Sequence, residues 1–115
     1  MKLCFGSNRI DRICNDPTAA RRKLPTQKHV DKLYQRLQEL ASFQRLSDIP
    51  SAPPLRRHKL KGKRKEMWAI DILNKTDGWR ICFTPVDFDQ AQDGSITIES
   101  VVSICIVDIG DYHNG

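Results

Sequence analysis

The most informative stretch of this 115-residue chain is residues 68–84, WAIDILNKTDGWRICFT. Two runs within it carry an apolar side chain at every second position: Trp68, Ile70 and Ile72, then Trp79, Ile81 and Phe83. That spacing is typical of strands with one buried face. Asp77-Gly78 supplies turn geometry between the runs. The stretch therefore predicts a β-hairpin whose loop is residues 74–78.

Towards the C-terminus, Phe88 to Ser95 is acidic and polar, which indicates a loop. Ile96 to Ile109 is rich in β-branched residues and predicts the last strand, interrupted near Glu99-Ser100.

The residues before the hairpin predict helices. Asp16-Pro17 is a helix start with Asp16 as the cap, and this helix stops at Pro25. Thr26 can cap a second, longer helix. Its apolar stripe comprises Val30, Leu33, Tyr34, Leu37, Leu40 and Ala41, and its polar side comprises Lys28, Lys32, Gln35, Arg36 and Glu39.

Two further segments complete this outline. Leu3 to Phe5 can form a short first strand, and residues 49–54, IPSAPP, cannot be helical. Helices followed by an antiparallel sheet make an α+β fold, and the length suits a single domain over residues 1–115.

Composition narrows the class of protein. No apolar run is long enough to span a membrane, and the opening MKLCF is too soon polar for a secretory signal, so we expect a cytoplasmic protein. The four cysteines are scattered without a C-x-x-C pair, so we expect neither a structural metal nor another cofactor.

Charge is divided unevenly along the chain. Residues 1–66 hold 17 of the 19 Lys and Arg residues and 6 of the 14 acidic residues, whereas the remainder has a net negative charge. Such asymmetry indicates an anionic partner for the first part, with nucleic acid the leading candidate, or else a solvated basic surface.

Residues 56–65, RRHKLKGKRK, concentrate seven of these cations. A basic run held on a scaffold binds polyanions in a salt-dependent way. Leu60 interrupts the charge where an extended segment would direct it into the core, with Lys59 and Lys61 on the other side. We therefore expect a docked basic surface.

Two more sites carry side chains suited to binding or catalysis. Arg80 is the basic residue of the central hairpin strand, and it suits either an ion pair with Asp71 across the hairpin or a phosphate contact. The chain closes with Asp111, Tyr112 and His113, and a histidine can exchange a proton near neutral pH.

Four of these segments together resemble the HigB killer-protein family of the RelE/ParE toxin superfamily. They are Leu60-Lys61-Gly62-Lys63-Arg64, Trp68-Ala69-Ile70, Trp79-Arg80-Ile81-Cys82-Phe83 and Asp111-Tyr112-His113. The resemblance covers residues 55–113 firmly and the preceding helices weakly. It implies a RelE/ParE-like fold, with N-terminal helices packed on a twisted antiparallel sheet.

The resemblance also implies a function. Members of the family cleave mRNA, typically in the A site of the 30S subunit, and a helix-turn-helix antitoxin of the HigA type holds them inactive. It implies a metal-independent endoribonuclease with catalytic residues Lys61, Asp111, Tyr112 and His113. We expect phosphate contacts from Arg64, Arg80, Lys59 and Arg57.

The sequence departs from the family pattern at several positions. Glu66 replaces the usual glycine before the aromatic strand, the loops at 74–77 and 86–95 are longer, and Asn114 and Gly115 follow the histidine. Gly110 is expected to loosen the final residues. Two other functions remain open: a ParE-like inhibitor of DNA gyrase, and a non-catalytic nucleic-acid-binding module.

Overall fold

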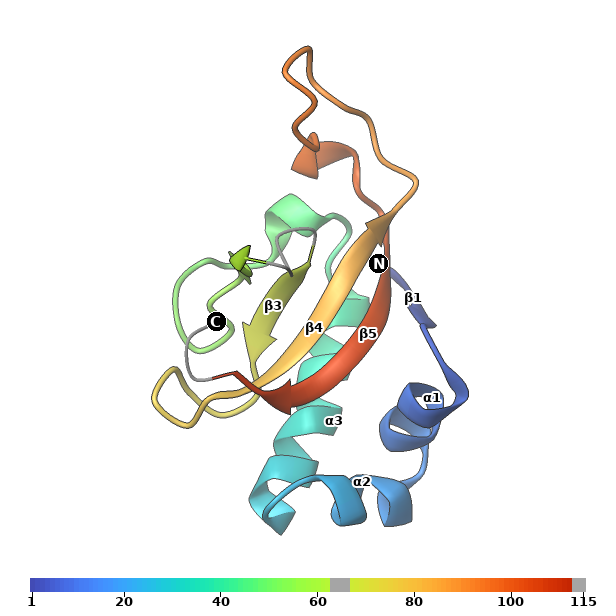
Figure 1. The fold of residues 1–115 in the computed structure, drawn as a ribbon, viewed down its shortest axis with the longest axis vertical. Coiled ribbons are helices and arrows are strands. Elements are labelled where there is room, and N and C mark those ends of the chain that lie inside the picture. Colours follow the sequence, from blue (N-terminus) through green and yellow to red (C-terminus); the bar gives the residue numbers. More distant parts are fainter. Residues whose placement is uncertain (63–66, 113–115) are drawn as a thin grey trace.

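The computed structural model of the protein describes residues 1–62 and 67–112. Within them, five strands form one sheet in the order β1-β5-β4-β3-β2 (Figure 1). The strands are β1 (Lys2–Phe5), β2 (His58–Lys59), β3 (Trp68–Asp71), β4 (Trp79–Val86) and β5 (Ser103–Asp111). The expected α+β class is confirmed. The sheet is mixed, because β1 pairs parallel to β5 whereas the other pairs are antiparallel.

The predicted hairpin is present. Strands β3 and β4 pair with Ile70 opposite Ile81 and Asp71 opposite Arg80. Gly78 has a φ of +89°, a backbone conformation that a residue without a Cβ adopts readily. The loop is also attached to a helix, because His29 Nε2 lies 3.0 Å from Asp77 Oδ2.

Three α-helices precede the hairpin: α1 (Asn8–Asn15), α2 (Pro17–Lys23) and α3 (Gln27–Ser42). The two predicted caps are confirmed, since Asp16 accepts from the Thr18 amide at 3.0 Å and Thr26 accepts from the His29 amide at 3.3 Å. The sequence analysis missed α1. Ser7 caps this helix, and its eight residues bury Ile10, Ile13 and Cys14.

The polarity predicted for α3 was correct along most of its length. Val30, Leu33, Leu37 and Leu40 are buried. Ala41 is exposed, and Arg36, which we expected on the polar side, is 3% exposed. The Arg36 Nε donates to the carbonyls of Asp71 and Ile72 at 3.2 Å, and its Nη1 lies 2.8 Å from Glu39 Oε1. Arg36 is buried because it satisfies carbonyl groups where β3 ends.

The main core lies between the helices and one face of the sheet. Leu33 and Leu40 of α3 and Ile81 and Phe83 of β4 are fully buried there. Each such side chain stabilises the fold by about 1.5–3 kcal/mol relative to an exposed one. The helices therefore occupy one face, and the opposite face remains for other contacts.

The segments that connect the helices and strands include short 3-10 helices and a long loop. Residues 49–54 form no helix, and the short 3-10 helices η1 (Leu46–Asp48) and η3 (Ile98–Ser100) lie in the loops. The strand predicted from Ile96 to Ile109 begins later than expected: residues 98–100 form η3 around the expected interruption, and β5 starts at Ser103. The long loop between β4 and β5 projects beyond the end of the sheet (Figure 1). In the described part of the chain, no helix combines the length and apolar character needed to cross a bilayer.

Candidate functional site

A small apolar cluster lies on the face of the sheet away from the main core. Its buried members are Leu60, Ala69 and Cys82, and Met67, Val107 and Tyr112 pack against them. We call it the Leu60 cluster. Leu60 is 4% exposed and its amide donates to the Met67 carbonyl at 3.0 Å, which confirms its inward orientation. The cluster holds Leu60, directly after β2, against the sheet.

Tyr112 joins the end of the described chain to this cluster. Its amide donates to the Gly78 carbonyl at 2.7 Å, so the backbone stays attached to the hairpin beyond β5. Its hydroxyl donates to the carboxylate of Asp108. Two anchors, one on the backbone and one on the ring, therefore orient Tyr112.

Gly110 makes room for that ring. A Cβ atom at this position would lie 3.1 Å from Tyr112 Cε2 and 3.3 Å from Asp108 Oδ2. Both distances are closer than ordinary carbon contacts. The missing side chain of Gly110 lets Tyr112 pack closely, and the residues after Tyr112 that Gly110 was expected to loosen lie outside the described part of the chain.

Of the predicted catalytic residues, Lys61, Asp111 and Tyr112 are among the described residues and His113 is not. Lys61 is exposed directly after Leu60, and Gly62 has a φ of +71° that turns the chain there. Asp111 is exposed at the end of β5, where it pairs with Trp79 of β4. His113 and the predicted phosphate contact Arg64 lie outside the described residues. Leu60 and Tyr112 thus bring the segments that carry Lys61 and Asp111 to one region of the sheet.

Arg80 lies in the interior. The side chain is 1% exposed, and its Nε is 3.0 Å from Asp71 Oδ1. Its terminal nitrogens donate to the carbonyls of Asn74 and Lys75 at 3.2 and 2.7 Å. Of the two interpretations of Arg80, the ion pair with Asp71 is confirmed. A direct phosphate contact needs an exposed nitrogen, and this packing buries the side chain.

Asp71 also forms an ion pair with a second arginine, Arg56. Arg56 Nε and Nη2 donate to its two carboxylate oxygens at 2.9 and 3.0 Å. Burial lowers the pKa of Arg80, and the Asp71 carboxylate opposes that shift by stabilising the charged guanidinium. One buried carboxylate thus lies between two guanidinium groups and couples the basic segment to β3 and β4.

Arg57 and Lys59 lie away from Tyr112. Lys59 pairs with Trp68, so their side chains share the face opposite the Leu60 cluster. The Arg57 Cζ is 5.4 Å and the Lys59 Nζ 5.6 Å from the Trp68 ring centroid, within cation–π range. Burial lowers the pKa of Arg57. These two predicted phosphate contacts therefore lie at the sheet edge, on its other side.

His58 is a candidate that the sequence analysis did not select. It pairs with Ala69 and so shares the face of the Leu60 cluster. Its Nδ1 donates to the Arg56 carbonyl at 2.7 Å, because a carbonyl oxygen only accepts, and this places the proton of the neutral ring on Nδ1. Its Nε2 has no hydrogen-bond partner among the described residues. Alternation with Leu60 was the signal that could have identified it.

No metal site accompanies these groups in the described residues. Across 1–62 and 67–112, no three His, Cys, Asp or Glu side chains gather closely enough to hold an ion. What the face of the Leu60 cluster offers chemically is the Tyr112 hydroxyl, which is bonded to the Asp108 carboxylate, and the exposed Lys61 follows Leu60 in the chain.

Comparison with known proteins identifies the fold. No protein-family model and no curated protein sequence matches the chain. Among solved structures, a YoeB/ParE toxin from Agrobacterium tumefaciens is similar, with a TM-score of 0.52 and 16% sequence identity. The match covers 98% of this chain and 99% of that one. At this identity the likeness shows the fold, which is of the RelE/ParE type.

Proposed function

We propose that this protein is the toxin of a toxin–antitoxin system and that it cleaves mRNA, as proteins of the HigB type do. The observation that carries the proposal is the packing of Tyr112 in the Leu60 cluster. Tyr112 and Leu60 contribute to the same cluster, which supports a site shared by the C-terminal segment and the segment that holds Lys61. The fold similarity to a YoeB/ParE toxin supports the same class of protein.

The proposed reaction uses the nucleophile that RNA carries. The ribose 2′-OH attacks the adjacent phosphorus and the 5′-oxygen leaves, which produces a 2′,3′-cyclic phosphate and a 5′-hydroxyl. One group removes the proton of the 2′-OH and another protonates the departing oxygen. His113 and Asp111 are the proposed acid–base pair, in either order, and no metal is required.

The other residues act on charge and position. Lys61 and Arg64 stabilise the negative charge that develops on the non-bridging oxygens. Tyr112 stacks on a base or orients the phosphate. Its hydrogen bond to Asp108 fixes the orientation of the ring for either role. Arg57 and Lys59 contribute phosphate contacts at the edge of the sheet. Arg80 contributes through its positive charge alone, since its side chain is buried.

The proposal names two macromolecular partners. The substrate is mRNA in the A site of the 30S subunit. The second partner is a helix-turn-helix antitoxin of the HigA type, because a toxin must be neutralised in the cell that makes it.

A cleavage map on translating ribosomes tests the proposal. His113→Ala should slow cleavage by about 10²- to 10⁴-fold, the range for one general acid or base. Lys61→Ala should slow it by about 10²- to 10³-fold. Lys28→Ala, which removes an exposed lysine on α3, should leave the rate unchanged. Equal rates for all variants would exclude these residues from the chemistry.

A ParE-like inhibitor of DNA gyrase is the second candidate, because the similar structure carries the ParE name as well. A gyrase inhibitor needs no acid–base pair, so its activity should survive His113→Ala. A supercoiling assay with purified protein distinguishes the two. Salt-sensitive RNA binding without cleavage on ribosomes would instead indicate a non-catalytic binding module.

A further inference from the structure

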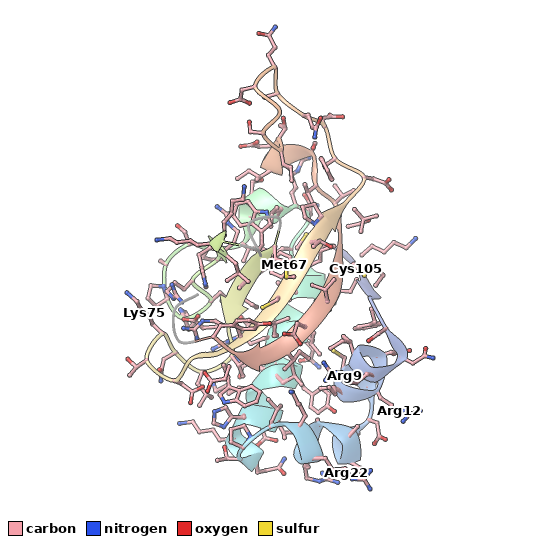
Figure 2. All side chains as sticks on the ribbon, in the orientation of Figure 1. Arg9, Arg12, Arg22, Met67, Lys75 and Cys105 are labelled. Atoms are coloured by element: carbon pink, nitrogen blue, oxygen red, sulfur yellow. The ribbon has the colours of Figure 1, made fainter. Side chains whose placement is uncertain are left out.

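A basic groove of about 630 Å³ lies between α1 and α2, outside the candidate site. Arg9 and Arg12 of α1 and Arg22 and Lys23 of α2 line it. Figure 2 shows Arg9, Arg12 and Arg22 together on these two helices. Its volume is within the range of about 300–1,000 Å³ that ligand-binding clefts occupy.

The positive charge of the groove is largely uncompensated. Asp16 is its acidic lining residue, and the Oδ1 of that side chain already accepts from the Thr18 amide. Arg12 and Arg22 are exposed, and neither forms an ion pair with any residue in the described part of the chain. Guanidinium groups without a carboxylate partner are available to phosphate oxygens, which they match with two parallel hydrogen bonds.

Arg9 connects the groove to the candidate site. Its Nη2 lies 3.5 Å from Asp108 Oδ1, and the other oxygen of the same carboxylate accepts from Tyr112. Asp108 is thus shared between the groove and the residue that ends the described chain. The groove and Tyr112 therefore meet at this carboxylate.

We propose that the groove binds the sugar–phosphate backbone of the RNA strand, on one side of the bond that is cleaved. This inference rests on the proposed function, because it assigns a second contact region for the same substrate. Arg9 and Asp108 link the groove to Tyr112 of the candidate site. This link favours RNA as the ligand, because the substrate of that site is RNA, over an acidic peptide that binds the groove alone. The apolar lining from Ile13 and Ala19 suits the ribose faces between phosphates.

Binding of a fluorescent 2′-O-methyl RNA 12-mer to the full chain, measured by anisotropy, tests this. Such an oligonucleotide lacks the 2′-OH nucleophile, so binding is separated from cleavage. The test variant is R12A/R22A. The matched control is R21A/K28A. It also removes two positive charges, but from exposed positions of α2 and α3 that do not line the groove.

The proposal expects R12A/R22A to weaken binding by about tenfold. It also expects the slope of log K against log salt to fall by about 1.4, because each phosphate contact on a single strand contributes about 0.7. The control should change both values much less. Equal losses in the two variants, or no binding by wild type at 150 mM salt, would overturn the proposal.

Two further measurements distinguish RNA from an acidic protein as the ligand, and the groove from the cleavage reaction. If hexaglutamate binds and loses affinity in R12A/R22A while RNA does not, the groove serves an acidic protein and the RNA assignment is wrong. Cleavage on ribosomes by wild type is recorded separately. Cleavage without a groove effect rejects this inference alone, whereas a groove effect without cleavage rejects the proposed reaction alone.

Discussion

The hydroxyl of Tyr112 donates a hydrogen bond to the carboxylate of Asp108, and the Tyr112 ring lies across the intervening Gly110. Asp108, Gly110 and Tyr112 alternate along one face of the extended chain, and Gly110 has no side chain between the other two, so the carboxylate and the ring can meet. The contact gives Tyr112 one orientation.

Asp108→Ala should lower kcat of the proposed cleavage by about 10- to 100-fold, because a displaced side chain near the reacting groups costs that much. KM should change less, since the hydroxyl orients the substrate and contributes little to overall binding. Asp108→Asn keeps an acceptor oxygen and should recover most of the rate. Steady-state cleavage on ribosomes measures both constants. An Asn variant as slow as the Ala variant would contradict a positioning role for the hydrogen bond.

Gly110→Ala should destabilise the fold by about 1–3 kcal/mol, the usual cost of inserting a methyl group into a packed region. The new Cβ would lie 3.1 Å from Tyr112 Cε2. Urea unfolding of four proteins, wild type, Gly110→Ala, Tyr112→Ala and the double variant, measures the coupling. The glycine change should cost less when the ring is absent. Additive effects would show that the ring and the glycine do not interact.

Asp71→Asn should destabilise the protein by about 3–5 kcal/mol, because it removes the counter-charge of a buried pair. The carboxylate is 2% exposed and lies 3.0 Å from the Arg80 Nε. The control is Arg9→Ala, which breaks an ion pair whose arginine is 59% exposed and should cost below about 1 kcal/mol. Thermal unfolding monitored by circular dichroism compares the two. Similar midpoints would contradict the interior role assigned to Asp71.

The stability of the protein should fall in alkaline solution because of Cys14. Burial, with a smaller effect of Asp11, raises the pKa of its thiol from 9.0 to about 12. Below pH 9 the thiol is protonated in both states, and this contribution is fully present. Above pH 9 the unfolded chain loses the proton first, so stability decreases as the pH rises towards about 12, by up to about 1.4 kcal/mol per pH unit.

The measurement is the free energy of unfolding of wild type and Cys14→Ala between pH 8 and pH 11. The alanine variant should start lower, because a buried side chain is shortened, and its curve should fall less steeply above pH 9. Parallel curves across the whole range would show that the Cys14 thiol does not contribute to the alkaline loss.

Features that depend on near neighbours could be read from the sequence. Asp16 and Thr26 cap helices by bonding to amides two and three residues ahead, and both caps were predicted correctly. Alternation predicted the β3–β4 hairpin and the inward direction of Leu60. Helix α1 was missed although Ser7 caps it and Ile10, Ile13 and Cys14 stand at the helical spacing i, i+3 and i+4, because eight residues hold only about two turns of that pattern.

Features that depend on distant partners could not be read in this way. Arg36 looks like a surface residue in the sequence, yet it is buried, because it bonds to the carbonyls where β3 ends. For Arg80 the sequence left an ion pair with Asp71 and a phosphate contact open, and only the packing decided between them. Alternation did predict that Lys59 points away from Leu60, but the sequence did not show that Arg57 and Lys59 would lie over the Trp68 ring, which the pairing of β2 with β3 brings to them.

The amino-acid sequence alone therefore determined most of the elements, their ends and which side of each strand is apolar, since these follow from interactions within a few residues. The tertiary structure decided which charged side chains are buried, which share a face with Tyr112, and that Arg9 reaches Asp108. Those contacts join residues far apart in the chain, and a local pattern carries no information about the register and packing that bring them together.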